Sequence, residues 1–346
     1  MAGSRLDELF RRTCKERPKL ILSFRWKAIA LSIVLAVLAG VYVAGELFNG
    51  PTMYGRAIQT PLFPSFDPAK AESIQLSDGH GKDIELRRNG SVWNVVLGQE
   101  ELPASLAKVH AFLSSVANLE RGKLANTNSA LDGEFNLDAA HARRVRIKAD
   151  AGKVVADIWV GKSGSSGFED YLRKADDNHI YLTRSSMAFY FAETRSYWYD
   201  LALLPDDVTG SSIQSVDVSG DIPADASGHR FIHESYRLVR KGAAMAQRWT
   251  ADGSPMMLNQ GRVQTTCNHL ASLQGVDFVL DGQTQKNNPL TITVTTDRGS
   301  QYVLHAVYDA GKEQYLVTRN HLPYVYLVNT AALIRIVLPL EELVSH

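Results

Sequence analysis

RRNGSVWNVV (87–96) is predicted to form a β-hairpin, because apolar and polar residues alternate on both sides of its Asn-Gly turn. A helix is expected next, over PASLAKVHAFLSSVANLE (103–120), where apolar residues recur at helical spacing behind Pro103. Alternating strand sequences follow, among them RRVRIKAD (143–150) and KVVADIWV (153–160). One long helix against several antiparallel strands predicts an α+β unit.

The same order of segments returns in diverged form later in the chain. A hairpin sequence at 236–252 precedes a predicted helix at 258–278, and strand sequences follow it. Three matched pairs support the comparison: Trp93 with Trp249, Leu113 with Leu270, and Tyr181 with Tyr326. Self-similarity in a fixed order is a property of the fold. We therefore expect two duplicated α+β modules with antiparallel sheets, at 71–207 and 208–346.

The composition is that of a folded protein, since 45% of the 346 residues are apolar and 21% are charged. The net charge of zero conceals an asymmetry. Residues 1–27 hold eight basic and three acidic residues, a balance of +5, which leaves −5 for the rest of the chain. Neutralising phosphates requires a basic surface. We therefore expect no nucleic-acid partner.

Residues 28–48 are predicted to form one transmembrane helix. AIALSIVLAVLAGVYVAG (28–45) carries no charge, and Leu47 and Phe48 extend it to about the length that crosses ~30 Å of hydrocarbon. Because Lys and Arg crowd the preceding segment, residues 1–27 are expected in the cytoplasm and the body outside. The expected localisation is the inner membrane, single-pass, with a periplasmic or extracytoplasmic C-terminal part.

Two alternatives compete with this topology. A buried core helix would be unusually apolar all round, and a cleavable signal peptide would have a shorter basic region. An uncleaved anchor is favoured. Residues 49–70, with four prolines and two glycines, are expected to be a linker. Cys14 and Cys267 fall on opposite sides of the membrane in this topology, so no disulfide is expected between them.

Four parts of the chain share a pattern with a known group of proteins. They are the Trp93 hairpin with the helix sequence after it, FNLDAA (135–140), VGKSGSSGFEDYLRK (160–174) and YDLALL (199–204). On these segments the chain resembles the membrane-anchored bacterial family grouped as domain of unknown function 4340, with Asn136 where glycine is usual. The resemblance implies a single-span protein with an extracytoplasmic body, associated with a gliding-motility-type ABC transporter system as an accessory subunit.

The residues do not predict a catalytic, cofactor or metal site. VGKSGSSG (160–167) lacks the order of a phosphate-binding loop, since Lys162 precedes the glycines, and a hairpin loop is the better interpretation. His229, His233 and Glu234 are close in sequence but lack the spacing of metal ligands. No Ser, His and Asp can be assigned to a triad. We expect no enzyme, no cofactor and no metal ion.

FYFAETRSYWYDLALL (189–204) is unusually aromatic, because six aromatic residues fall within eleven. Filling of the seam between the modules is the favoured interpretation, and a partner surface comes second. The corresponding stretch of the second module, LIRIVLPLEELV (333–344), is aliphatic. Three interpretations stay open: the rings fill the seam between the modules, form a partner surface, or bind a ligand. The residues expected in a partner surface are Phe189, Tyr190, Tyr197, Trp198 and Tyr199.

Two functional hypotheses follow from these patterns. The leading one is a non-enzymatic, membrane-anchored extracytoplasmic accessory or scaffold subunit of an envelope or ABC-transporter-type complex, whose partners are membrane proteins of that complex. The alternative is an extracytoplasmic protein that binds a glycan or small molecule in the cleft between the modules. A hydrolase ranks third.

Overall fold

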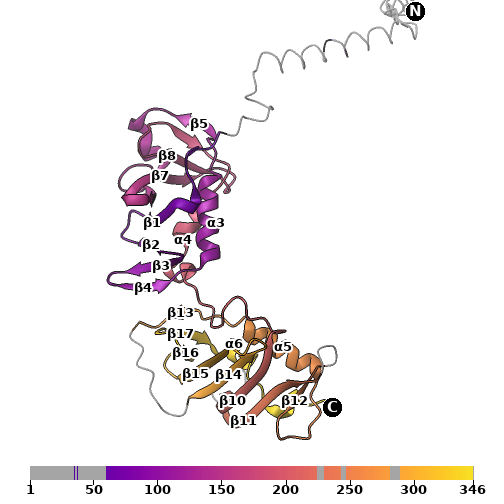
Figure 1. Cartoon of the computed structure of the whole chain (residues 1–346). Coiled ribbons are helices and arrows are strands. Elements are labelled where there is room, and N and C mark those ends of the chain that lie inside the picture. The colour runs from indigo at the N-terminus through magenta and orange to yellow at the C-terminus, as the bar shows by residue number, and fades with distance from the viewer. Residues whose placement is uncertain are drawn as a thin grey trace, which may run out of the picture. The chain divides into compact units, whose positions relative to one another are not determined.

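The computed structural model describes residues 35, 37, 60–223, 230–242, 247–280 and 289–345. The chain divides into two compact units, Met1–Thr60 and Pro61–His346. Of the first unit only Leu35, Val37 and Thr60 are described, and Leu35 and Val37 are helical. The second unit contains two antiparallel sheets, coloured indigo to magenta and orange to yellow in Figure 1.

The first sheet has nine strands in the order β4-β3-β2-β1-β6-β7-β8-β9-β5. Its strands are β1 (Ala71–Ser77), β2 (Asp83–Asn89), β3 (Val92–Leu97), β4 (Glu100–Pro103), β5 (Lys123–Asn126), β6 (Arg143–Ala149), β7 (Lys153–Ser163), β8 (Asp170–Lys174) and β9 (Ile180–Leu182). This module also contains the helices α3 (Leu106–Ala117) and α4 (Ala188–Ala192), with 3-10 helices at Pro68–Lys70, Ser129–Phe135, Asp150–Gly152 and Arg195–Trp198.

Among the described residues, the second sheet has eight strands in the order β12-β11-β10-β14-β15-β16-β17-β13. Its strands are β10 (Ile213–Pro223), β11 (Phe231–Lys241), β12 (Arg248–Ala251), β13 (Asp277–Phe278), β14 (Leu290–Thr296), β15 (Gln301–Asp309), β16 (Gln314–Arg319) and β17 (Val325–Asn329). The helices of this module are α5 (Gln260–Ala271) and α6 (Thr330–Ile334), with a 3-10 helix at Leu340–Leu343.

The two sheets share one topology apart from β4. Strands β3-β2-β1-β6-β7-β8-β9-β5 follow the same spatial order as β12-β11-β10-β14-β15-β16-β17-β13. The register makes Trp93 and Trp249 equivalent, because they pair with Arg88 and Arg240 at the same place in their sheets. Strand β4 has no counterpart among the described residues of the second sheet.

The two long helices are also equivalent, and their caps fix the alignment. Each has twelve residues, beginning after the N-cap Ser105 in α3 and after the N-cap Asn259 in α5. Counted from these caps, Leu113 corresponds to Cys267 rather than to Leu270. Positions three apart lie on one helix face, and Cys267 and Leu270 are both buried. Apolar spacing alone therefore could not set the register.

The core forms where alternate strand residues meet the apolar face of a helix. In the first module Ile74 and Ile147 are fully buried on neighbouring strands, and Val109 and Val116 of α3 are equally buried. Each such side chain contributes roughly 1.5–3 kcal/mol by leaving water. The predicted Asn-Gly hairpin is confirmed: β2 and β3 pair, and Gly90 has φ +65°, which glycine adopts without strain.

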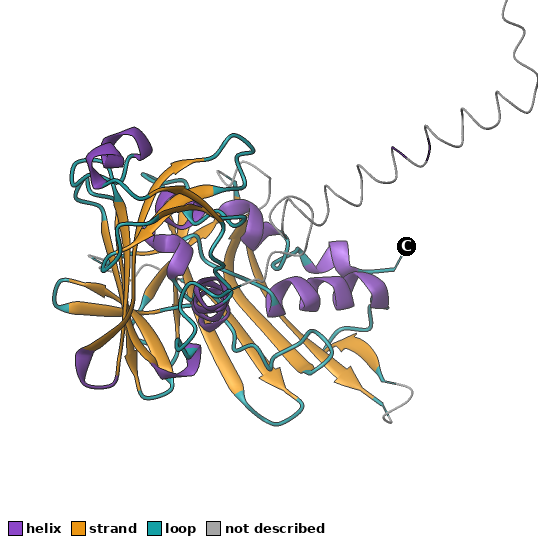
Figure 2. Ribbon diagram, turned by 90° about the horizontal axis from the view of Figure 1, so that it is seen from above, coloured by secondary structure: helices purple, strands orange, loops and turns teal. Residues whose placement is uncertain are grey.

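The predicted fold class, α+β behind one transmembrane helix, is wrong for this structure. Both modules are antiparallel sheets with few helices, as the predominance of strands in Figure 2 shows. The predicted long helices are shorter than expected because β4 and β13 take their flanking residues into the sheets. Among the described residues no helix is long and apolar enough to cross a membrane. Residues 28–48 lie outside them, apart from Leu35 and Val37.

Residues 61–70, expected in the linker, belong to the first module. Leu62 is 1% exposed, and its N–H donates to the carbonyl oxygen of Leu119 at 2.7 Å, just beyond α3. Phe66 is also buried. Residues 49–59 lie outside the described residues. The apolar residues between the prolines therefore form core contacts that proline content alone did not indicate.

Candidate partner-binding site

Several of the aromatic residues of 189–199 pack against α3. Trp198 is fully buried, and its ring centroid lies 5.5 Å from that of Phe112 on α3. Tyr190 packs edge-on against the same Phe112 at 4.8 Å, and Tyr197 packs edge-on against Trp198 at 5.1 Å. Edge-to-face geometry at these distances is favourable for aromatic pairs. Trp198 is therefore a core residue of the first module.

Phe189 forms the outer layer of this aromatic cluster. Its side chain is 50% exposed, and its ring lies 5.5 Å from both Tyr190 and Tyr197, edge-on in each case. Tyr190 and Tyr197 are half-buried, and burial raises the pKa of the Tyr197 hydroxyl. An exposed ring with two tyrosines packed behind it is held more rigidly than a lone surface phenylalanine. We call Phe189, Tyr190 and Tyr197 the aromatic surface.

Polar groups fix the aromatic surface from below. The Lys108 Nζ on α3 donates to the carbonyl oxygen of Tyr197 at 2.6 Å and lies 4.8 Å from the centre of its ring. The hydroxyls of Ser115 and Tyr190 lie 3.2 Å apart. The Lys82 Nζ donates to the carbonyl of Phe191 at 3.1 Å, near the C-terminal end of α4. The Lys108 and Ser115 contacts hold α4 and the following turn against α3, and the Lys82 bond connects α4 to the β1–β2 turn.

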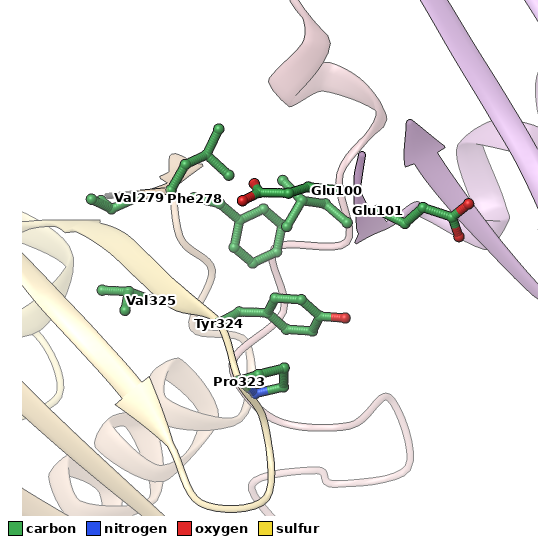
Figure 3. A pocket seen from close by; sticks show the side chains of 9 residues that line it. Glu100, Glu101, Phe278, Val279, Pro323, Tyr324 and Val325 are labelled. Atoms are coloured by element: carbon green, nitrogen blue, oxygen red, sulfur yellow. The ribbon is translucent and has the colours of Figure 1, made fainter. Parts of the chain in front are cut away.

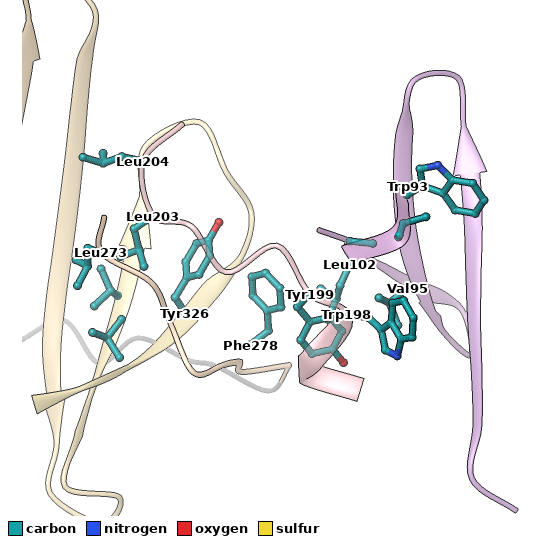
Figure 4. Packing of buried hydrophobic residues seen from close by; sticks show 14 of the residues in the cluster. Trp93, Val95, Leu102, Trp198, Tyr199, Leu203, Leu204, Leu273, Phe278 and Tyr326 are labelled. Carbon is teal, nitrogen blue, oxygen red and sulfur yellow. The ribbon is translucent and has the colours of Figure 1, made fainter. Parts of the chain in front are cut away.

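Tyr199 lies in a different environment, at the junction of the two modules. It is 6% exposed and its ring lies 5.2 Å from that of Phe278 in the second module. Figure 4 shows Tyr199 and Leu102 of the first module beside Phe278 and Tyr326 of the second. Burial, then the neighbouring Asp277 carboxylate, raises the pKa of Tyr199. The five predicted residues thus separate into a surface trio, a core residue and a junction residue.

Residues 198–203 are hydrogen-bonded through their backbone to both modules. The Ser105 N–H of the first module donates to the carbonyl oxygen of Trp198 at 2.8 Å. The Leu203 N–H donates to the carbonyl oxygen of Leu273 in the second module at 3.0 Å. Linkers between domains are usually exposed and make few contacts with either domain. Backbone hydrogen bonds to both modules are therefore unusual for such a segment. The sequence YWYDLALL therefore closes one module and opens the next.

Two hollows lie at this junction. One, of about 270 Å³, is formed by β4 and by the residues around Phe278 and Tyr324, with Glu100 reaching across and Glu101 pointing away (Figure 3). The other, of about 440 Å³, includes Asp200 and Arg319. The Arg319 guanidinium donates to the carbonyl oxygen of Leu203 at 2.8 Å.

The sequence interpretation missed Phe278, Tyr324 and Arg319 as junction residues. Phe278 and Arg319 are isolated in their segments, and Tyr324 has only Tyr326 near it, so none shows the clustering of 189–199. The only available signal was the repeat itself. Phe278 occupies the position of Leu124 in the first module, so the two modules differ there by an aliphatic and an aromatic residue.

A second missed group lies on the outer face of the first sheet. The Arg144 guanidinium makes two bonds of 2.7 Å to Asp157, and Arg146 lies 3.2 Å from the same carboxylate. Trp159 lies between Arg144 and Arg173, at 4.8 and 6.0 Å from its ring. The positions of the second sheet equivalent to Arg144, Arg146, Trp159 and Arg173 are Thr291, Thr293, His305 and Thr318.

The other candidate segments have ordinary structural roles. Lys162 lies near the end of β7 and the glycines after it lie in the turn to the antiparallel strand β8, which confirms the predicted hairpin loop. His233 is exposed and its Nδ1 lies 3.0 Å from Asp221, while His229 lies outside the described residues. Within the described ranges, no three His, Cys, Asp or Glu side chains gather to hold a metal ion.

The fold and the junction define a class: tandem antiparallel-sheet modules joined by a hydrogen-bonded connection. The family model for the domain of unknown function (DUF4340) matches residues 93–293, from β3 of the first sheet into β14 of the second. The match covers more than half of the chain, so the protein belongs to this family.

One curated relative is similar over part of the chain. An uncharacterized protein of Treponema pallidum (strain Nichols) is 22% identical over 128 residues, which are 37% of this chain and 40% of that protein. The chain thus spans less than half the length of the relative it matches. No solved structure matches.

Proposed function

We propose that this protein is a non-enzymatic scaffold subunit that binds a protein partner of an envelope complex through its aromatic surface. The observation that supports this is Phe189, half-exposed yet packed on both Tyr190 and Tyr197. Aromatic side chains on a rigid support are the residues that contribute most to protein–protein affinity. Lys108, bonded beneath Tyr197, adds to the rigidity of the site.

The proposed setting is the inner membrane, with the two modules outside the cytoplasm and an ABC-transporter-type membrane protein as partner. This part of the proposal rests on the sequence, namely the basic residues 1–27 and the apolar residues 28–48, and on what the family resemblance implies. A partner embedded in the membrane would meet the aromatic surface from outside the cytoplasm.

Photo-crosslinking in cells tests the proposal. The photoreactive residue p-benzoylphenylalanine replaces Phe189 in the full-length chain, and Phe168 in a matched control, because Phe168 is 79% exposed on the β7–β8 turn. We expect an adduct with an envelope membrane protein, identified by mass spectrometry, at position 189 and none at position 168. Absence of any adduct at 189, or equal adducts at both positions, would contradict the proposal.

A second candidate function is ligand binding at the module junction, favoured by the hollows of about 270 and 440 Å³ there. Sites between two packed bodies are common for small ligands. Thermal-shift measurements of the full chain against envelope saccharides test it. A shift that Tyr324→Ala removes, while the outer-face variant Trp159→Ala keeps it, supports the junction site. No shift at saturating saccharide eliminates it.

A further inference from the structure

The connection between the modules repeats a pattern that is present at each module's own ends. Each module begins with a segment whose backbone bonds to the residues that follow the long helix of that module. The Leu62 N–H donates to the carbonyl oxygen of Leu119, and the Leu203 N–H donates to that of Leu273. Each module closes with a segment that pairs before that helix, in the bridges Ala104 to Tyr199 and Leu258 to Val344. At the junction, the closing segment of the first module is followed directly by the opening segment of the second. The first module also has an opening segment, and the second module also has a closing segment, that are not part of this junction.

The junction joins two surfaces of opposite kind. The receiving surface belongs to the second module and contains Leu204, Phe278 and Arg319. The inserting surface belongs to the first module and contains Leu102 and Pro103 of β4. Phe278 is 8% exposed and Leu102 is 5% exposed.

The first module has an equivalent of the receiving surface that is exposed. Strand register makes Leu124 the equivalent of Phe278 and Lys174 the equivalent of Arg319. Leu124 is 49% exposed, where Phe278 is 8%. In the same module, Phe63, Pro64 and Lys174 border a hollow of about 630 Å³, and the Lys174 Nζ lies 5.6 Å from the centre of the Phe63 ring.

The second module exposes apolar residues at the place in the chain that corresponds to the inserting surface, although its described residues form no strand equivalent to β4 there. The closing bridges make Leu258 the equivalent of Ala104, so by count along the chain Met256 and Met257 correspond to Leu102 and Pro103 of β4. These methionines are 47% and 75% exposed. Methionine adapts its shape to an apolar partner surface. Leu124 of the first module and Met256 and Met257 of the second are therefore exposed, whereas the corresponding residues at the junction, Phe278 and Leu102, are buried.

We infer that a second copy of this chain docks head-to-tail, with its Met256–Met257 inserting surface on the Leu124 receiving surface of the first copy. The intramolecular junction is the template for this contact, because it joins the same two kinds of surface. A contact between different surfaces of identical chains is heterologous and propagates as a chain or closes as a ring. The protein would therefore assemble into arrays of modules in one direction.

Cysteine crosslinking of full-length protein tests this inference. In a Cys14→Ser background, Leu124→Cys and Met257→Cys chains are purified separately and mixed under mild oxidation. Cys267 does not interfere, because burial raises the pKa of its thiol to about 12 and keeps it protonated. We expect a 124–257 disulfide-linked dimer in the mixture, and none when Phe168→Cys replaces Leu124→Cys.

Sedimentation measurements supply an independent readout. We expect self-association that Leu124→Asp weakens by about tenfold or more, since a carboxylate would then be buried against methionine. A chain that stays monomeric at every concentration overturns the inference. So does a dominant 124–124 link, which would indicate a two-fold symmetric contact. The inference is equally overturned if the residues that precede the first module in the same chain, or a different protein, cover Leu124 in place of a second copy.

Discussion

The carboxylate of Asp170 is fully buried and accepts four hydrogen bonds. Its donors are the hydroxyls of Ser163 and Ser186, at 2.8 and 2.9 Å, and the N–H groups of Met187 and Ala188, at 2.6 and 3.0 Å. The two N–H groups belong to the start of α4, which has no side-chain cap of its own. Asp170 thus connects β8 to the helix that carries Phe189.

Asp170→Ala should therefore destabilise the protein severely. Four hydrogen bonds to a charged acceptor would be lost, each worth about 1.5–3 kcal/mol, and the Met187 N–H would be left buried, so we expect a loss of at least about 3 kcal/mol. Asp170→Asn keeps one acceptor oxygen and should lose roughly half as much. Urea unfolding of both variants measures this, and equal stability of Asp170→Ala and wild type would contradict the role of the carboxylate.

Asp157 gives the outer face of the first sheet a pH dependence. Burial opposes ionisation of its carboxylate, but the bonds and charges of Arg144 and Arg146 outweigh that effect and lower the pKa of Asp157. A lowered carboxylate pKa stabilises the fold above the unfolded value of about 3.9, and this stabilisation disappears as pH falls through the folded pKa.

The stability difference between wild type and Asp157→Asn should therefore depend on pH. We expect the variant to melt at a lower temperature at pH 7 and the difference to shrink below about pH 4. Asp176→Asn is the control, because the Asp176 side chain is 77% exposed and its pair with Lys174 contributes little. Thermal melts across this pH range decide the question, and a difference that persists unchanged at pH 3 would count against it.

Helices α3 and α5 differ in how they begin, although they occupy equivalent places. The Asn259 side chain accepts from the Arg262 N–H at 3.1 Å, whereas Ser105 makes no side-chain cap bond. We expect Asn259→Ala to cost about 1 kcal/mol and Ser105→Ala distinctly less. Chemical unfolding of the two variants compares them directly. An equal loss in both would show that capping is not the source of the difference.

Element boundaries were the part of the fold that sequence predicted least well. Pro103 was a reasonable first residue for a helix, but it ends β4, because its backbone pairs with Asn94 on β3. Such pairing depends on a neighbouring strand and leaves no local signature. The hairpin turn was predictable, since Asn-Gly encodes its own geometry. Asn136, in place of the family's usual glycine, has φ +56°, a left-handed conformation that asparagine tolerates.

At the scale of the whole molecule, the location and burial of each aromatic residue depend on the elements packed around it rather than on its residue type. Tyr197, Trp198 and Tyr199 are consecutive, yet one is half-buried at a surface, one is in the core and one is at the junction. Clustering could identify the segment, but the assignment of each ring required the position of α3 and of Phe278. The repeat supplied the order of elements without the contacts between modules.

Phe278 should couple the two modules, because its ring lies 5.2 Å from Tyr199 of the first and 4.9 Å from Tyr326 of the second. Phe278→Ala is expected to cost about 3–5 kcal/mol and to let the modules unfold in separate transitions. Leu124→Ala changes the equivalent position of the first module, 49% exposed, and should shift stability by at most about 0.5 kcal/mol. Differential scanning calorimetry at low protein concentration, where self-association is absent, distinguishes the two variants. A single unshifted transition in Phe278→Ala would mean that the backbone bonds of residues 198–203 couple the modules without it.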